Sequence, residues 1–210
     1  MGNPMKTYLY CSLVLLLGAV ASAGSLAEVD SPSEATKLAA ETFQVLGITL
    51  GTSMVTDLGR VLGPAPFRVS ADNEGTVSCY CSPGNARTLL EFRAWAGTIA
   101  EFRFSQGSPQ TVNRCANSRL VSSSLATASG LRLGMSRRQI MALLGAPTRT
   151  RQDHFIYESI YDRPPTPEEV KHFNDAFYAP PALINVHERV DVRFRGGKAV
   201  RVDVLRAQDW

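Results

Sequence analysis

Two stretches alternate apolar and charged residues so regularly that each predicts an antiparallel hairpin. In one, residues 188–195 and 199–205 flank the turn Gly196-Gly197-Lys198. In the other, residues 88–93 and 98–104 flank a turn that contains Trp95. Successive side chains of a strand point to opposite faces of its sheet. Each hairpin is therefore expected to have one apolar face, suited to be covered by helices, and one charged face exposed to solvent. Further strands are predicted at 76–81 and 154–161, where the same period appears.

The charged faces of the hairpins supply the candidate binding residues. Arginines alternate there with aspartates and glutamates, a pattern that suits docking through electrostatic complementarity. Trp95 at a hairpin tip could anchor an interface, or it could cap the core. We expect a protein partner to contact these residues: Glu91, Arg93, Trp95, Glu101, Arg103, Arg189, Asp191, Arg193, Arg201 and Asp203.

Residues 130–147 predict a short helix that is marked at both ends. Ser136 and Gln139 have the spacing of a capping box, in which side chain and backbone satisfy each other at the helix start. Gly145 can take the left-handed conformation that ends a helix, and Pro147 cannot continue it.

A weaker copy of this pattern occupies residues 47–66, with Ser53 as its expected N-cap, and a longer helix is expected before it, from Ser31-Pro32 to Gly47. Each half of the chain then contains two helices, a strand and a closing hairpin. We therefore expect an α+β fold, a tandem repeat of one helix-helix-three-stranded antiparallel sheet unit. The alternative is a single mixed domain in which the similarity of the halves is accidental.

The expected boundaries follow from composition. Residues 24–110 form the first, degenerate repeat, 111–129 a Ser-rich linker, and 130–210 the second repeat, with an insertion at 164–187. The insertion predicts a short helix that begins at Thr166-Pro167. Its aromatic side chains could form a lid over a small ligand: Phe173, Phe177 and Tyr178.

The first 23 residues have the features of a secretory signal peptide. Lys6 precedes an apolar run from Leu13 to Val20, and Ala21-Ser22-Ala23 resembles a cleavage site. The apolar run is far shorter than the roughly 20 residues of a membrane-spanning helix. We expect cleavage after Ala23, a periplasmic or secreted protein, and no integral membrane segment after cleavage. A net charge of +3 favours no nucleic-acid partner.

Residues 131–147 resemble the signature of the small outer-membrane assembly lipoproteins, the SmpA/OmlA or BamE-like family. There a Gly-Met-Thr helix start and a Leu-Gly-x-Pro helix end precede an aromatic strand and a three-stranded antiparallel sheet. Gly134-Met135-Ser136 and Leu144-Gly145-Ala146-Pro147 match these positions, and Phe155-Ile156-Tyr157 is similar to the aromatic strand. The resemblance implies the tandem form of the fold found in secreted β-lactamase inhibitor proteins, whose concave sheet grips an enzyme. The chain differs from the family in lacking a lipobox, in its duplication and in its insertion, and no binding residue is carried over.

Three cysteines remain after signal cleavage: Cys79, Cys81 and Cys115. Cys79 and Cys81 share a face if they lie on one strand, so either could form a disulfide with Cys115 in an oxidising compartment. A redox-active Cys-x-Cys is the alternative, although no Lys, Arg or His lies close enough in sequence to lower a thiol pKa. Metal binding is disfavoured because no fourth ligand has finger-like spacing.

We find no catalytic signature in the sequence. Asp153-His154 near Ser159 invites comparison with a hydrolase triad, but no nucleophile elbow accompanies them. The remaining histidines, His172 and His187, show no ligand spacing, so neither metal nor cofactor is expected. We therefore expect a non-enzymatic module that binds another envelope or secreted protein, for assembly, scaffolding or inhibition. An envelope thiol-redox protein and a small-ligand carrier are the alternatives.

Overall fold

The computed structural model describes residues 38–69, 75–83, 88–107, 114–175 and 179–209. Residues 33–210 form one compact unit. The predicted signal peptide and the start of the predicted first helix lie outside the described residues.

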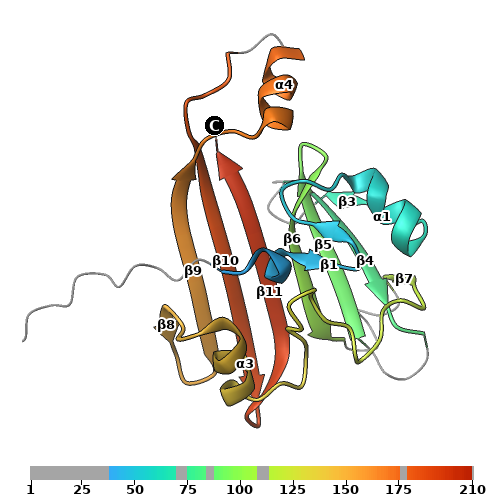
Figure 1. The fold of residues 1–210 in the computed structure, drawn as a ribbon. Coiled ribbons are helices and arrows are strands. Elements are labelled where there is room, and N and C mark those ends of the chain that lie inside the picture. Colours follow the sequence, from blue (N-terminus) through green and yellow to red (C-terminus); the bar gives the residue numbers. More distant parts are fainter. Residues whose placement is uncertain (1–37, 70–74, 84–87, 108–113, 176–178, 210) are drawn as a thin grey trace, which may run out of the picture. The chain divides into compact units, whose positions relative to one another are not determined.

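One large sheet dominates this unit (Figure 1). Its strands follow the order β3-β4-β5-β6-β11-β10-β9-β8 with antiparallel neighbours, and a ninth strand, β7, pairs with β4 in parallel. The strands of this sheet are β3 (Arg68–Val69), β4 (Thr76–Cys81), β5 (Thr88–Trp95), β6 (Thr98–Gln106), β7 (Ala116–Asn117), β8 (Arg149–Thr150), β9 (His154–Arg163), β10 (Ile184–Arg195) and β11 (Lys198–Asp209).

Both predicted hairpins are confirmed, as β5–β6 and β10–β11. The predicted strand at 76–81 is β4, and β9 extends the predicted strand by two residues at its end. All four long strands of the hairpins alternate buried and more exposed positions, as the period of two requires.

Three short α-helices lie in the described part of the chain: α1 (Val55–Leu62), α3 (Arg137–Leu144) and α4 (Pro167–Asp175). The capping box of α3 is confirmed, because the Gln139 N–H donates to Ser136 Oγ and the Ser136 N–H donates to Gln139 Oε1. The predicted cap of α1 was wrong by one residue. Met54 is the N-cap, and its N–H donates to the Asp57 carboxylate, while Ser53 Oγ accepts the Thr49 N–H instead.

The predicted tandem repeat of helix-helix-sheet units was wrong. The chain forms one continuous, mostly antiparallel nine-stranded sheet with few helical residues. The predicted helix through Gly47 is replaced by the 3₁₀ turn η1 (Ala40–Phe43) and a small hairpin, β1 (Gln44–Val45) and β2 (Ile48–Thr49). Leu46 and Gly47 turn this hairpin with φ of 51° and 78°.

The two halves are joined by strand pairing rather than separated. β6 and β11 pair from Ser105 opposite Arg201 to Glu101 opposite Leu205. The predicted linker at 111–129 is also not a spacer in its described part, because it contributes β7 and the buried side chains of Val121 and Leu125.

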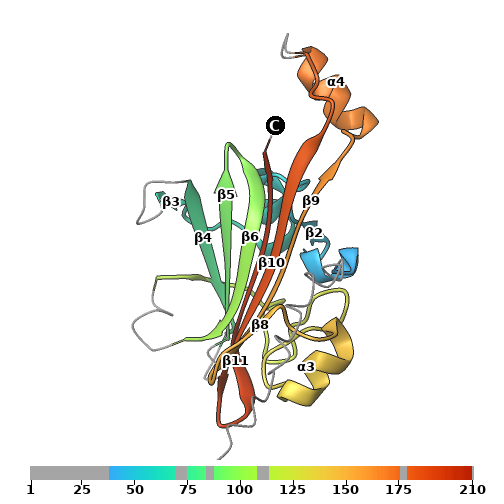
Figure 2. The ribbon, with the colours of Figure 1, turned by 90° about the vertical axis from the view of Figure 1, so that its left-hand side faces the viewer.

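The apolar face of the sheet carries the core. Phe92, Phe102 and Phe104 are each at most 1% exposed, and η1, the β1–β2 hairpin, α1 and α3 supply the side chains that cover them and their neighbours. Figure 2 shows η1 and α3 on the same side of the sheet. Burying each of these phenylalanine side chains contributes about 2–3 kcal/mol to the stability of the fold. The opposite side of the long strands therefore remains available for charged residues.

Candidate functional site: the charged sheet face

All ten predicted binding residues lie on one face of the large sheet. They belong to β5, β6, β10 and β11, and each alternates along its strand with residues of the buried core. We call this surface, opposite to the core and completed by the outward side chains of β9, the charged face. Strand register arranges it into rows that cross the sheet.

Three neighbouring rows contain nearly all of its charge. The first row is His154, Arg193, Arg201 and Ser105. The second is Ile156, Asp191, Asp203, Arg103 and Glu91. The third is Glu158, Arg189, Leu205, Glu101 and Arg93.

Arg103 is the centre of an ion-pair cluster on the part of the charged face formed by β5, β6 and β11. Its guanidinium lies 3.3 Å from Glu101 and 3.5 Å from Glu91, and it also donates to Asp203 on β11. Arg93 adds a 3.7 Å contact to Glu101. The cluster links β5, β6 and β11, so it ties the two hairpins together across their charged face.

The protonation of this cluster reflects its partial burial. Burial raises the pKa of Glu101, against the opposing effects of Arg103 and Arg93. For Arg103, burial acts to lower the pKa, but Asp203 and the two glutamates outweigh it and raise the pKa. Arg103 therefore stays charged at any pH at which the protein functions.

A second cluster surrounds Glu158, which the sequence did not single out. Its carboxylate lies 2.7 Å from Arg149, 3.1 Å from His187 and 3.7 Å from Arg189. The period of two along β9 places Glu158 on the charged face, so the alternation that found the hairpin residues could also have found this one.

Arg193 differs from the other arginines predicted to bind. It is exposed and makes no ion pair with the described residues, although Arg201 is its direct neighbour on β11 and His154 its neighbour on β9. Arg201 is held by Asp203 through contacts of 2.6 and 2.9 Å. A hollow of about 240 Å³ lies here, bounded by both arginines and by Asp191, one of whose carboxylate oxygens is buried without a hydrogen bond.

The predicted disulfide is confirmed, and of the two candidate partners of Cys115 it is Cys79 that forms it. The bonded residues, Cys79 and Cys115, are 36 residues apart in the sequence. Cys81 is buried, with its sulfur 3.1 Å from Asn117 Oδ1, and burial raises the pKa of its thiol. A buried thiol with a raised pKa is a poor nucleophile.

The residues that suggested a triad do not come together. His154 lies on the charged face and bonds Asp153 at 3.2 Å, whereas Ser159 is buried on the other face of β9, opposite Glu188. Within the described ranges, no three His, Cys, Asp or Glu side chains are placed to hold a metal ion.

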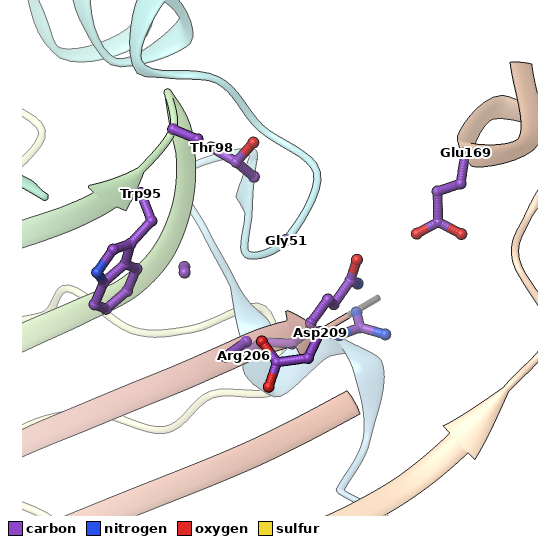
Figure 3. Close-up of a pocket in the computed structure, with 10 residues that line it drawn as sticks. Gly51, Trp95, Thr98, Glu169, Arg206 and Asp209 are labelled. Carbon is purple, nitrogen blue, oxygen red and sulfur yellow. The ribbon is translucent and has the colours of Figure 1, made fainter. Parts of the chain in front are cut away.

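A larger cleft of about 460 Å³ lies where β6 and β11 separate (Figure 3). Trp95 and Thr98 stand on one side, and Arg206 and Asp209 from the end of β11 stand on the other. Glu169 of α4 also lines it, so the predicted insertion borders this cleft. Of the proposed aromatic lid, Phe173 is half-buried, and Phe177 and Tyr178 lie outside the described residues.

Comparison with known proteins gives no relative for this chain: no family model, curated protein or solved structure matches it. Of the helices in the described residues, none is both long enough and apolar enough to cross a membrane.

Proposed function

We propose that this chain is an exported, non-enzymatic module that binds another envelope or secreted protein through its charged sheet face. The observation that carries the proposal is Arg193, an exposed cation that lies beside Arg201 and makes no ion pair with the described residues. Like charges directly opposite on neighbouring strands are destabilising. A carboxylate supplied by a partner would relieve this repulsion.

The surrounding ion pairs support a role in binding, because they hold the arginine side chains in defined positions. Arg103, Arg189 and Arg201 are each fixed by acids on the same face. Their side chains therefore lose little further freedom when a partner binds, which lowers the entropic cost of association. The partner that fits is a protein with an acidic side chain that reaches the hollow beside Arg193.

Export and a role in envelope assembly, scaffolding or enzyme inhibition rest on the N-terminal sequence and on the resemblance of residues 131–147. The thiol-redox alternative is less well supported, because Cys81 is buried and its thiol pKa is raised. The ligand-carrier alternative requires the cleft near α4, which is separate from Arg193.

The test is affinity capture from the native envelope fraction, followed by titration with the purified partner. Arg193→Glu should weaken binding at least about tenfold, since a charge pair desolvated at an interface is worth several kcal/mol. Its thermal midpoint should not fall, because Arg193 makes no ion pair with the described residues and the substitution removes its repulsion with Arg201. Arg201→Glu is a poorer probe, as it would also remove one of the two arginines that contact Asp203.

The matched control is Arg138→Glu, which reverses an exposed arginine on α3, over the opposite face of the sheet. It should bind as the natural chain does. Unchanged capture by Arg193→Glu, or equal loss with Arg138→Glu, would contradict the assignment of the charged face.

A further inference from the structure

The cleft between β6 and β11 contains an open strand edge. The two strands pair only as far as Glu101 opposite Leu205, but β11 continues to Asp209, paired with β10 on its other side. On the β6 side, no described strand pairs with residues 206–209. Such an edge is a template for a further strand.

The facing edge of β6 is already occupied. The Ile99 N–H donates to the Ser53 carbonyl at 2.9 Å, and the Ile99 carbonyl accepts the Gly51 N–H at 2.8 Å. An incoming chain could therefore pair with β11 alone. Ala100 and Ala207 present only small side chains to the cleft, whereas Gly51 lies close to the side chains of Gln208 and Arg206.

The side chains around the cleft define what kind of chain would fit. Trp95 offers an apolar surface, and the Arg93 guanidinium lies 5.5 Å from the centre of its ring. Asp209 is exposed and makes no ion pair with the described residues, whereas Glu169 is held by Arg163 at 2.5 Å. Asp209 is thus the acid at the cleft that remains for a ligand.

We propose that the cleft binds an extended peptide segment of a protein partner, added as a strand to residues 206–209 of β11. An apolar residue of the segment packs on Trp95, and a basic residue two positions away, on the same face of the added strand, pairs with Asp209. This site is independent of the proposed docking at Arg193, since that residue lies beside Arg201, at the opposite end of the β6–β11 pairing from the cleft.

The probe is the blocked pentapeptide Lys-Val-Phe-Val-Lys, whose palindromic sequence presents the same side chains in either strand direction. Binding to the full chain is followed by NMR. The expected result is slowed hydrogen exchange in residues 206–209 and a shift of the Trp95 indole N–H, assigned with Trp210→Phe. Asp209→Asn should bind the probe about tenfold more weakly, the value of one charge-assisted hydrogen bond.

Two N-methylated probes test whether the backbone is recognised. One is methylated on both valines and the other on the phenylalanine and both lysines, so that each lacks the residue N–H donors along one edge. One of them should lose binding and the other should keep it. Equal binding of parent and both methylated probes, binding matched by N-acetylphenylalanine amide, or no change at β11 would overturn the proposal. Arg193→Glu should bind the peptide normally, which separates this result from the test of the charged face.

Discussion

Arg103 and Arg193 show how the same residue type takes two roles on one face. Arg103 contacts acids on its own strand and on both neighbouring strands, and these acids raise its pKa against the effect of burial. Arg193 lies in a row of basic residues and polar Ser105. We expect the first to stabilise the fold, and we propose the second as the residue of recognition.

Replacing Arg103 by methionine should lower the free energy of unfolding by about 2 kcal/mol, because Asp203 and Glu101 lose a charged hydrogen-bond partner and Glu91 loses an ion pair in a partly buried site. Urea unfolding measures this. The control is Arg60→Met, since Arg60 pairs with Asp57 at 2.8 Å but its side chain is 78% exposed. That change should cost less than about 0.5 kcal/mol. Equal effects of the two substitutions would contradict the structural role of the Arg103 cluster.

At the scale of elements, an ion pair between Glu169 of α4 and Arg163 of β9 joins α4 to the sheet, and acid should break it. Glu169 accepts hydrogen bonds from Arg163 at 2.5 and 2.7 Å and from the Thr166 N–H. Hydrogen bonding to Arg163 is the main cause that lowers the pKa of Glu169 from 4.5 to about 2. A lowered folded-state pKa means that the stabilisation is complete above pH 4.5 and is lost as the pH falls toward 2.

Glu169→Gln should therefore reduce the hydrogen-exchange protection of α4 at pH 7, and the difference from the natural chain should shrink as the pH falls through this window. Glu168→Gln, at an exposed neighbour in the same first turn, is the control and should leave protection unchanged. A loss of protection in Glu169→Gln that is the same at pH 7 and near pH 2 would show that the contact with Arg163 does not hold α4.

The elements that could be predicted from sequence are those whose signals are local. The period of two identified both long hairpins, and the spacing of Ser136, Gln139 and Gly145 identified α3. The helix predicted through Gly47 failed because apolar residues from Leu38 to Val45 fit a helical spacing as well as the turn and strand they form. Leu46 and Gly47, both left-handed, decide in favour of the hairpin.

At the scale of the whole molecule, the register between β6 and β11 could not be predicted. These strands are far apart in the sequence. The outer strand of each hairpin could, from the sequence alone, pair with more than one other strand. The same pairing brings Arg103 to Asp203, so the ten candidate residues could be named from alternation, but their assembly into one face could not.

A continuous sheet should unfold as one unit. We expect β5 and β10 to lose hydrogen-exchange protection at the same denaturant concentration. Phe102→Leu, at the β6–β11 junction, should lower this denaturant concentration by the same amount for both strands. The substitution should reduce the free energy of unfolding by about 1–2 kcal/mol. Separate transitions for the two strands would favour independent halves.

The most direct test of the charged face is a charge exchange with the captured partner. Once hydrogen-exchange protection has located the partner carboxylate nearest Arg193, that acid is changed to arginine and titrated against both the natural chain and Arg193→Glu. The account predicts that each single reversal weakens binding at least about tenfold and that the double reversal restores most of it. Additive losses, with no recovery in the double reversal, would contradict the claim that the charged face is the docking surface.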